Sequence, residues 1–142
     1  MAAPELDIRA YREGDEAAVV ALWTRVFAET RPWNQPAAYI RRKLAVQREL
    51  FLVGALDGRI VATVLAGYDG VRGWVYHLAV VPEQRRHGFG RAMMVAAEQR
   101  LRRLGCEKIN LQIVRANAEA VRFYERIGFA VEDRISMGKR LG

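Results

Sequence analysis

Apolar residues recur at three- and four-residue steps in several segments, the spacing that places them on one face of an α-helix. The first such set follows Gly14-Asp15, which suit a turn and a helix N-cap, and consists of Val19, Leu22, Trp23, Val26 and Phe27. Three more helices are predicted: from Pro36 towards Leu50, over residues 90–104 with Met93, Met94, Ala97 and Leu101 inside, and from the N-cap Asn117 through Arg126. Gly105 and Gly128 mark the ends of the last two helices.

Shorter runs, alternating or continuously apolar, predict strands over residues 7–11, 51–56, 59–68, 74–81, 108–114, 129–131 and 134–141. Asp57-Gly58 suits a type I′ turn, so the strands on either side of it should be antiparallel neighbours. Pro82 ends the fourth strand. This order predicts an α/β (α+β) fold with one domain over residues 1–142: a mixed, mostly antiparallel sheet of six to seven strands with about four helices on its faces.

Composition supports one compact domain without covalent or metal cross-links. The chain has 142 residues, 51% of them hydrophobic, one cysteine and two histidines. Cys106 is expected to be structural, and no metal site is expected. The apolar run 60–66 is far shorter than the roughly 20 residues that cross a bilayer, and residues 1–6 lack a signal-peptide pattern, so we expect no membrane partner and a cytoplasmic location.

The net charge of +7, from 23 Lys and Arg against 16 Asp and Glu, could attract either nucleic acid or a small polyanion. The arginines are scattered, and no basic run is interleaved with aromatic residues. We therefore expect no nucleic-acid partner.

The strongest chemical feature is the segment 85–91, which consists of Arg85, Arg86, His87, Gly88, Phe89, Gly90 and Arg91. Glycines at the start of a helix let backbone N–H groups approach an anion, and arginines supply the opposite charge, so a pyrophosphate would fit. A solvated turn is the alternative explanation. Gly90 is followed by Arg91-Ala92 rather than by Lys and Ser or Thr, which excludes a Walker loop, and Met93 occupies the third glycine position of a dinucleotide fingerprint.

A second segment runs from Asn117 to Phe129. Together the two segments resemble the GNAT family of N-acetyltransferases, in which Q/R-x-x-G-x-G/A binds the pyrophosphate of acetyl-CoA and N-x-x-A-x-x-x-Y-E-x-x-G-F lies beside the pantetheine and thiol. The matching residues are Arg85, Gly88 and Gly90 in the first segment, and Asn117, Ala120, Tyr124 and Glu125 in the second. A narrower resemblance, to the YpeA-like subgroup, lies in residues 31–34, 51–53, 67–70 with 72–73, and 136–141.

The family resemblance also implies roles at the reaction centre. Backbone N–H groups of Leu78, Ala79 and Val80 would polarise the thioester carbonyl, and Tyr124 would protonate the departing thiolate. A core tyrosine is the alternative for Tyr124. The acceptor would be lined by the segment between the first two helices, with Arg31, Trp33 and Asn34, although Trp33 could equally tie its loop to the core.

The general base is not specified by the motifs. Trp74 and Gln112 occupy the positions that match the glutamates of histone-type and ribosomal-protein acetyltransferases. His77, Asp69, Tyr76 and Glu29 remain as candidates, with His77 in the right titration range, although a lone histidine on a strand is often only packed there.

The predicted function is acetyl transfer from acetyl-CoA to an amine of a small molecule or peptide by direct attack. The alternative is a non-catalytic acetyl-CoA or CoA-binding regulatory module. The last strand could also join the sheet of a second copy, so a homodimer is one state that the chain would permit.

Overall fold

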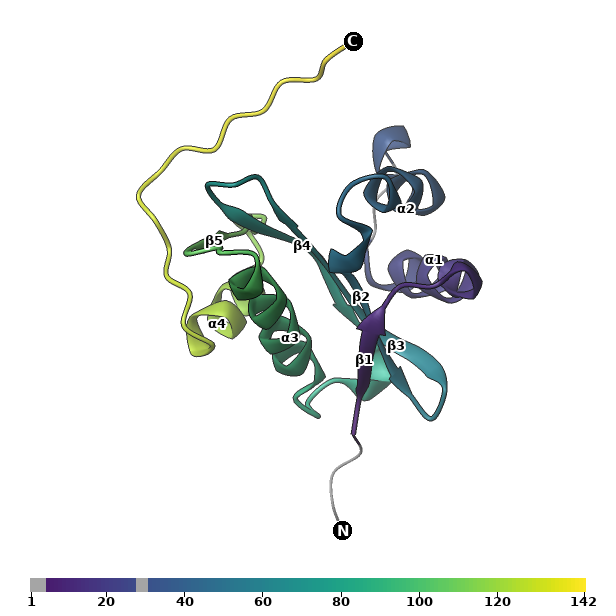
Figure 1. Cartoon of the computed structure of the whole chain (residues 1–142). Coiled ribbons are helices and arrows are strands. Elements are labelled where there is room, and N and C mark those ends of the chain that lie inside the picture. Colours follow the sequence, from purple (N-terminus) through teal and green to yellow (C-terminus); the bar gives the residue numbers. More distant parts are fainter. Residues whose placement is uncertain (1–4, 28–30) are drawn as a thin grey trace. The chain divides into compact units, whose positions relative to one another are not determined.

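The computed structural model describes residues 5–27 and 31–142, and the chain forms two compact units, Met1–Leu111 and Gln112–Gly142. Among the described residues, the first unit contains all the strands and three α-helices, and the second contains the fourth helix (Figure 1).

Five strands form one sheet in the first unit, in the order β1-β2-β3-β4-β5. They are β1 (Asp7–Ala10), β2 (Phe51–Leu56), β3 (Arg59–Tyr68), β4 (Gly73–Val80) and β5 (Ile109–Asn110). The first three pairings are antiparallel and the last is parallel, which confirms the predicted mixed, mostly antiparallel sheet. Asp57 and Gly58 have φ of 51° and 79°, as a type I′ turn between β2 and β3 requires.

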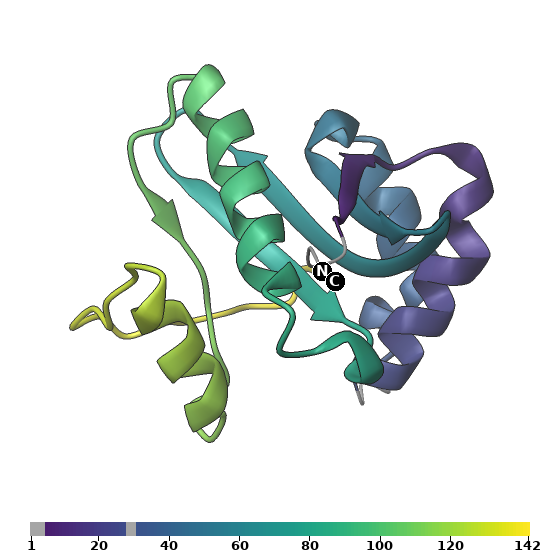
Figure 2. The ribbon, with the colours of Figure 1, turned by 90° about the horizontal axis from the view of Figure 1, so that it is seen from below.

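Four α-helices lie among the described residues: α1 (Glu16–Val26), α2 (Pro36–Leu44), α3 (Phe89–Arg103) and α4 (Ala118–Arg126). In the first unit, α3 covers one face of the sheet, and α1 and α2 cover the other (Figure 2). Helix α2 ends six residues before the predicted Leu50, because the chain turns at Gln47 (φ 49°). The Gln47 amide group bonds both the backbone N–H and the carbonyl of Tyr68, which ties this turn to β3.

The apolar faces predicted from the sequence form the core. The largest fully buried side chains include Trp23, Phe51, Ile40, Met93 and Leu101. Cys106 is buried with its thiol donating to the Lys108 carbonyl oxygen at 3.3 Å, as expected of a structural cysteine.

The prediction of six to seven strands was wrong, because the described residues contain five. The strand predicted over residues 108–114 is reduced to Ile109–Asn110, where β4 offers Gly73 and Trp74 as partners. The hairpin predicted over residues 129–141 has no strand, and Ile135, Met137 and Leu141 are each 90% exposed. Alternating apolar residues indicate a segment that can pair as a strand but do not supply its hydrogen-bonded neighbour.

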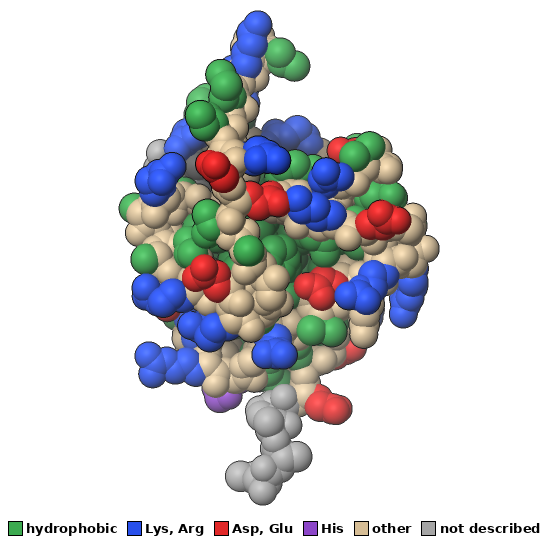
Figure 3. All heavy atoms as spheres, turned by 90° about the vertical axis from the view of Figure 1, so that its left-hand side faces the viewer, with side chains coloured by type: hydrophobic (Ala, Val, Ile, Leu, Met, Phe, Trp, Pro, Cys, Tyr) green, Lys and Arg blue, Asp and Glu red, His purple; other side chains and the backbone are tan. Residues whose placement is uncertain are grey.

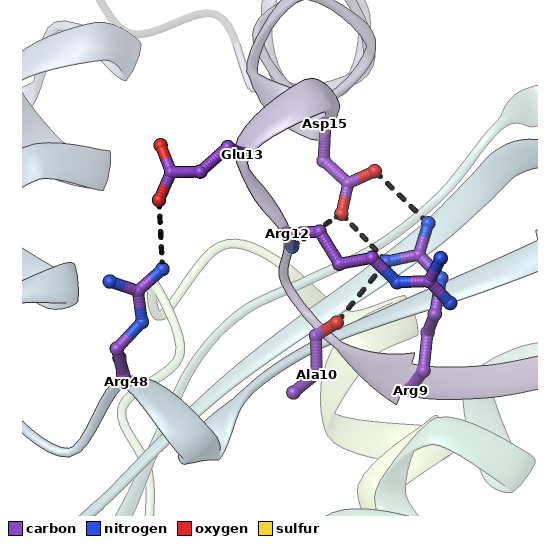
Figure 4. Close-up of polar contacts among 6 residues, drawn as sticks. All are labelled: Arg9, Ala10, Arg12, Glu13, Asp15 and Arg48. Atoms are coloured by element: carbon purple, nitrogen blue, oxygen red, sulfur yellow. Dashed lines mark hydrogen bonds and ion pairs between the residues drawn. The ribbon is translucent and has the colours of Figure 1, made fainter.

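Polar contacts organise the chain between β1 and α1 (Figure 4). Both carboxylate oxygens of Asp15 accept from the Arg9 guanidinium, at 2.7 and 3.0 Å, and one also accepts from the Arg12 N–H at 2.8 Å. These bonds hold the pKa of Asp15 below its usual range, the Arg9 hydrogen bond being the largest cause. Asp15 therefore ties the start of α1 to β1 and to Arg12, and its carboxylate makes no cap bond to the helix itself.

The described residues form no helix long and apolar enough to cross a membrane. On the face in Figure 3, lysine and arginine side chains are interspersed with aspartate and glutamate. Across residues 5–27 and 31–142, no group of three or more His, Cys, Asp or Glu side chains could hold a metal ion.

Candidate active site

Strand β4 departs from regular pairing in its middle. Two of its residues, His77 and Leu78, oppose the single residue Val64 of β3. His77 has φ 50°, a left-handed conformation that is uncommon for residues other than glycine. This geometry is a β-bulge, a feature over-represented beside active sites because it bends the strand and redirects side chains.

A buried hydrogen-bond chain holds the bulge. The Thr63 hydroxyl donates to the His77 carbonyl oxygen at 3.0 Å and accepts from the Trp23 indole N–H at 2.9 Å. Thr63 and Trp23 are 0% and 1% exposed, so water does not compete for these bonds. Neither residue was predicted to shape the site; the available signal is that Thr63 is the one polar residue in the apolar run 60–66.

The His77 ring lies among aromatic side chains on the α1 and α2 face of the sheet. Its centroid is 4.2 Å from that of Tyr39, 4.6 Å from Trp23 and 4.7 Å from Phe27. The ring is half-buried. A proton acceptor here would therefore be held in one orientation by packing.

The other predicted bases differ in their surroundings. Asp69 is exposed, and its carboxylate accepts from the N–H groups of Arg72 and Val71, which lowers its pKa. Burial raises the pKa of Tyr76, with a further contribution from the charge of Asp69. These directions make the Asp69 carboxylate a weaker base and keep the Tyr76 hydroxyl protonated. Glu29 lies outside the described residues.

The predicted anion-binding segment begins just after β4. A 3-10 turn, Pro82–Gln84, leads to Gly88, which is the N-cap of α3 and has φ 78°. The first backbone N–H groups of a helix have no intrahelical acceptor, and they carry the positive end of the helix dipole. A Cβ at Gly88 would meet no atom within 4 Å, so the space beside this residue is open.

Charged side chains surround this helix start, while one aromatic residue anchors it. Arg85, Arg86, His87 and Arg91 are exposed, whereas Phe89 is 4% exposed. The His87 ring stacks on Phe89 with a centroid distance of 5.6 Å. The start of α3 is thus anchored by a buried aromatic side chain, while the arginines around it face solvent.

The second predicted motif lies in the second unit. Asn117 caps α4, its side-chain oxygen accepting from the Ala120 N–H at 3.1 Å, as predicted. The Tyr124 ring packs edge-on against Phe123 and Phe129, with centroid distances of 5.0 and 5.5 Å. Burial raises the pKa of Tyr124 to about 12, so its hydroxyl stays protonated at neutral pH.

The end of α4 follows the predicted pattern. The N–H groups of Gly128 and Phe129 donate to the carbonyl oxygens of Glu125 and Tyr124, which closes the last turn. Gln112, which stands where a ribosomal-protein acetyltransferase would have glutamate, donates to the Ser136 hydroxyl.

The predicted acceptor residues lie in the connection between α1 and α2. Trp33 and Asn34 belong to a 3-10 turn, Pro32–Asn34, and Arg31 is its N-cap. Arg42 of α2 donates to the Trp33 carbonyl oxygen, which ties the turn to that helix.

The structure thus joins part of the predicted site within the first unit. His77, Leu78, Ala79 and Val80 run continuously from the bulge towards the segment 85–91. Asn117, Ala120 and Tyr124 belong to the other unit.

Comparison with known proteins gives matches along most of the chain. The model of the acetyltransferase (GNAT) family matches residues 16–129. An acetyltransferase of Yersinia pestis (strain Pestoides F) is 39% identical over 136 residues, which are 96% of each chain.

Solved structures share the fold. Ard1 from Thermoplasma volcanium has a TM-score of 0.80 at 24% identity, covering 89% of this chain and 84% of its own. The aminoglycoside N-acetyltransferase AAC(6')-Iy in complex with CoA has a TM-score of 0.77 at 15% identity, covering 96% of this chain and 95% of its own. Because the family match and the Yersinia relative are both acetyltransferases, the chain is an acyltransferase. GNAT acetyltransferases use acetyl-CoA and act on amine acceptors. The family match covers most of the chain, and the Yersinia relative has nearly the same length. The bulged central strand, which is followed by a helix with a glycine N-cap, agrees with these matches. This chain therefore belongs to the acetyltransferase (GNAT) family.

Proposed function

We propose that this acyltransferase moves an acetyl group from acetyl-CoA to the amine of a small molecule or peptide by direct attack. The observation that carries the proposal is the continuous stretch from the β4 bulge at His77 to the glycine-started helix α3. Within the family, the segments 31–34, 51–53, 67–70 with 72–73, and 136–141 support placement in the YpeA-like subgroup.

The residues at the start of α3 fit the pyrophosphate of acetyl-CoA. Arg85, Arg86, His87 and Arg91 would supply charge, while the backbone around Gly88, Phe89 and Gly90 would supply donors without a side chain in the way at Gly88. From the second unit, Asn117 and Ala120 would bind the pantetheine, on the strength of the motif that they match.

Bound acetyl-CoA supplies a thioester whose carbonyl carbon is open to attack. The acceptor nitrogen forms the new C–N bond, and the C–S bond then breaks with its electron pair leaving on sulfur. Backbone N–H groups among Leu78, Ala79 and Val80 would donate to the carbonyl oxygen while it carries negative charge, a contribution that is usually the largest single term in acyl transfer.

Two proton transfers complete the reaction. His77 would accept the proton that the amine loses, since an amine near pKa 10 is mostly protonated at neutral pH. Tyr124 would donate a proton to the departing thiolate. Its pKa of about 12 keeps the hydroxyl protonated before the reaction. The same high pKa means that the donation would take place within a hydrogen bond that forms as negative charge develops on sulfur. Arg31, Trp33 and Asn34 would contact the acceptor.

The test is Tyr124→Phe, which keeps the packed ring and removes the hydroxyl. We expect kcat to fall about 100- to 10,000-fold, the usual range for general acid catalysis, while acetyl-CoA affinity and Tm stay close to those of the parent. Tyr68→Phe is the matched control, because the Tyr68 hydroxyl bonds only backbone carbonyls in the first unit. Unchanged kcat in Tyr124→Phe would remove the proton-donor role, and a collapse of Tm would indicate a core tyrosine.

A further inference from the structure

A cavity of about 350 Å³ lies between α2 and the strands β3 and β4, on the face of the sheet that carries His77. Its volume is in the range of small-ligand sites. The polar part of its lining consists of Tyr39, Arg42, Lys43, Gln47 and Tyr76. Of these, only Tyr76 was singled out in the sequence.

Two tyrosines connect the cavity to the bulge. Tyr76 immediately precedes His77 in β4, and the ring centroid of Tyr39 is 4.2 Å from that of His77. A ligand in this cavity would therefore lie beside the residue that we propose as the base.

The lining of the cavity carries positive charge. Arg42 and Lys43 both contribute to it, and none of its lining residues in the described part of the chain is acidic. Two acidic side chains act electrostatically on its members from outside the lining, Glu49 on Lys43 and Asp69 on Tyr76. The Lys43 side chain is half-buried, and this burial lowers the pKa of its ammonium group.

Both cations keep hydrogen-bond donors for a ligand. Lys43 Nζ donates to the Val46 carbonyl oxygen at 3.0 Å and has two further N–H groups. Arg42 donates to the Trp33 carbonyl oxygen and lies 5.4 Å from the Tyr39 ring centroid, which orients its planar group. A guanidinium fixed in this way can bind both oxygens of a carboxylate.

We infer that the acceptor is a primary amine that also carries an anionic group, held by Arg42 and Lys43 in this cavity. The inference rests on the proposed function. A polycationic amine would be repelled from the cavity, whereas an anionic group would pair with both cations and offset the partial burial of Lys43. The positive potential would also favour the neutral form of the reacting amine, which is the form that attacks.

The experiment measures CoA release from acetyl-CoA with amines of matched length and different charge. The probes are γ-aminobutyrate, its amide and putrescine, with phosphoethanolamine as the phosphate-bearing arm. We expect kcat/KM for the better anionic amine to exceed that for the amide by about 10- to 100-fold, the effect of hydrogen bonds between charged groups, and to exceed that for putrescine by more. A comparable rate for the amide, or a preference for putrescine, would overturn the inference.

Substitutions in the cavity locate the effect. Arg42→Gln and Lys43→Gln should each reduce the preference for the anionic amine, mainly through KM, and Arg42→Glu combined with Lys43→Glu should shift it towards putrescine. Arg41→Glu is the matched control, because Arg41 lies on the same helix, is exposed and does not line the cavity. If the double variant does not fold, the two glutamine variants decide, and an unaltered preference in both would contradict the inference.

Failure of the proposed function gives a different result. Acetyl-CoA binding without CoA release above the solvent rate, for all four amines and for a panel of peptides, would count against amine acetylation itself. Release with no dependence on the charge of the acceptor would leave amine acetylation in place and reject only the anionic acceptor.

Discussion

The helices α1 and α3 begin in opposite ways. At the start of α1, Asp15 is 7% exposed and its carboxylate is occupied by Arg9 and by the Arg12 backbone. At the start of α3, Gly88 has no side chain, and the arginines near it are exposed. The first helix start uses a charged side chain in contacts within the fold, whereas the second has no side chain at its N-cap and has exposed arginines.

Together with the proposed pyrophosphate site, this difference predicts that stability and binding are separated in this chain. The Asp15 carboxylate accepts hydrogen bonds from Arg9 and from the Arg12 backbone, and its negative charge would disfavour an anion at the start of α1. A glycine at the start of α3 contributes less to helix stability but adds neither a side chain nor a negative charge near the helix N–H groups. Changes at the start of α1 should therefore alter stability alone, and changes at the start of α3 should alter acetyl-CoA affinity first.

Among changes at the helix starts, Gly88→Glu should have the largest effect. It places a side chain at a φ of 78° and adds negative charge where the pyrophosphate is proposed to bind. We expect acetyl-CoA Kd to rise about 100-fold, equivalent to about 2.7 kcal/mol, measured by calorimetry. Gly14→Glu adds the same side chain near the start of α1, in open space, and should leave Kd unchanged. Equal affinities in the parent and Gly88→Glu would show that the anion binds elsewhere.

Asp15→Ala should have the next largest effect, and on stability only. It leaves the part-buried Arg9 guanidinium and the Arg12 N–H without their acceptor, which should cost about 1 to 3 kcal/mol in the free energy of unfolding. Chemical denaturation measures this loss. Arg48→Ala removes the exposed pair with Glu13 and should cost less than about 1 kcal/mol. A clear change in acetyl-CoA Kd for Asp15→Ala would contradict the prediction that the start of α1 affects stability alone.

Asn117→Ala tests a helix start at which one side chain caps the helix and is also proposed to bind acetyl-CoA. Loss of its bond to the Ala120 N–H should cost about 1 kcal/mol of helix stability. Loss of a proposed pantetheine contact should weaken acetyl-CoA binding by about tenfold or less, well below the effect of Gly88→Glu. Asn117→Ser can keep the cap with a different side chain. If Asn117→Ala lowers Tm but not affinity, Asn117 is a structural cap only.

The smallest effect is the acid dependence that Asp15 contributes. Its folded-state pKa lies below the ordinary value of about 3.9, so its stabilisation is present above about pH 4 and is lost as the pH falls through the folded-state pKa. Between about pH 6 and about pH 3, the parent should therefore lose more Tm than Asp15→Asn does. Comparing the change of Tm with pH in the two proteins separates the contribution of Asp15 from that of other carboxylates. One of these is Glu83, whose pKa is lowered to about 2 by Arg25. Parallel slopes would mean that Asp15 does not titrate differently in the folded protein.

Much of the fold could be predicted because the signals are local. The turn at Asp57-Gly58, the cap at Asn117 and the stop at Gly128 depend on residues next to one another in the chain, and all three are confirmed. The glycine segment before α3 was predicted on the same basis. The hairpin over residues 129–141 was wrong, because a strand needs a hydrogen-bonded partner strand, and the sequence of the segment alone does not specify that partner.

By itself, the sequence determined the four helices, most of the strands, the apolar faces and the family, since backbone propensity, apolar spacing and short motifs are properties of consecutive residues. Only the tertiary structure decided that β4 carries its extra residue at His77, that Thr63 and Trp23 hold it there, and that Arg42 and Lys43 line the same cavity as Tyr76. These contacts join residues up to 40 positions apart. Their partners are chosen by strand register and by helix packing, which depend on the whole folded chain rather than on any one segment.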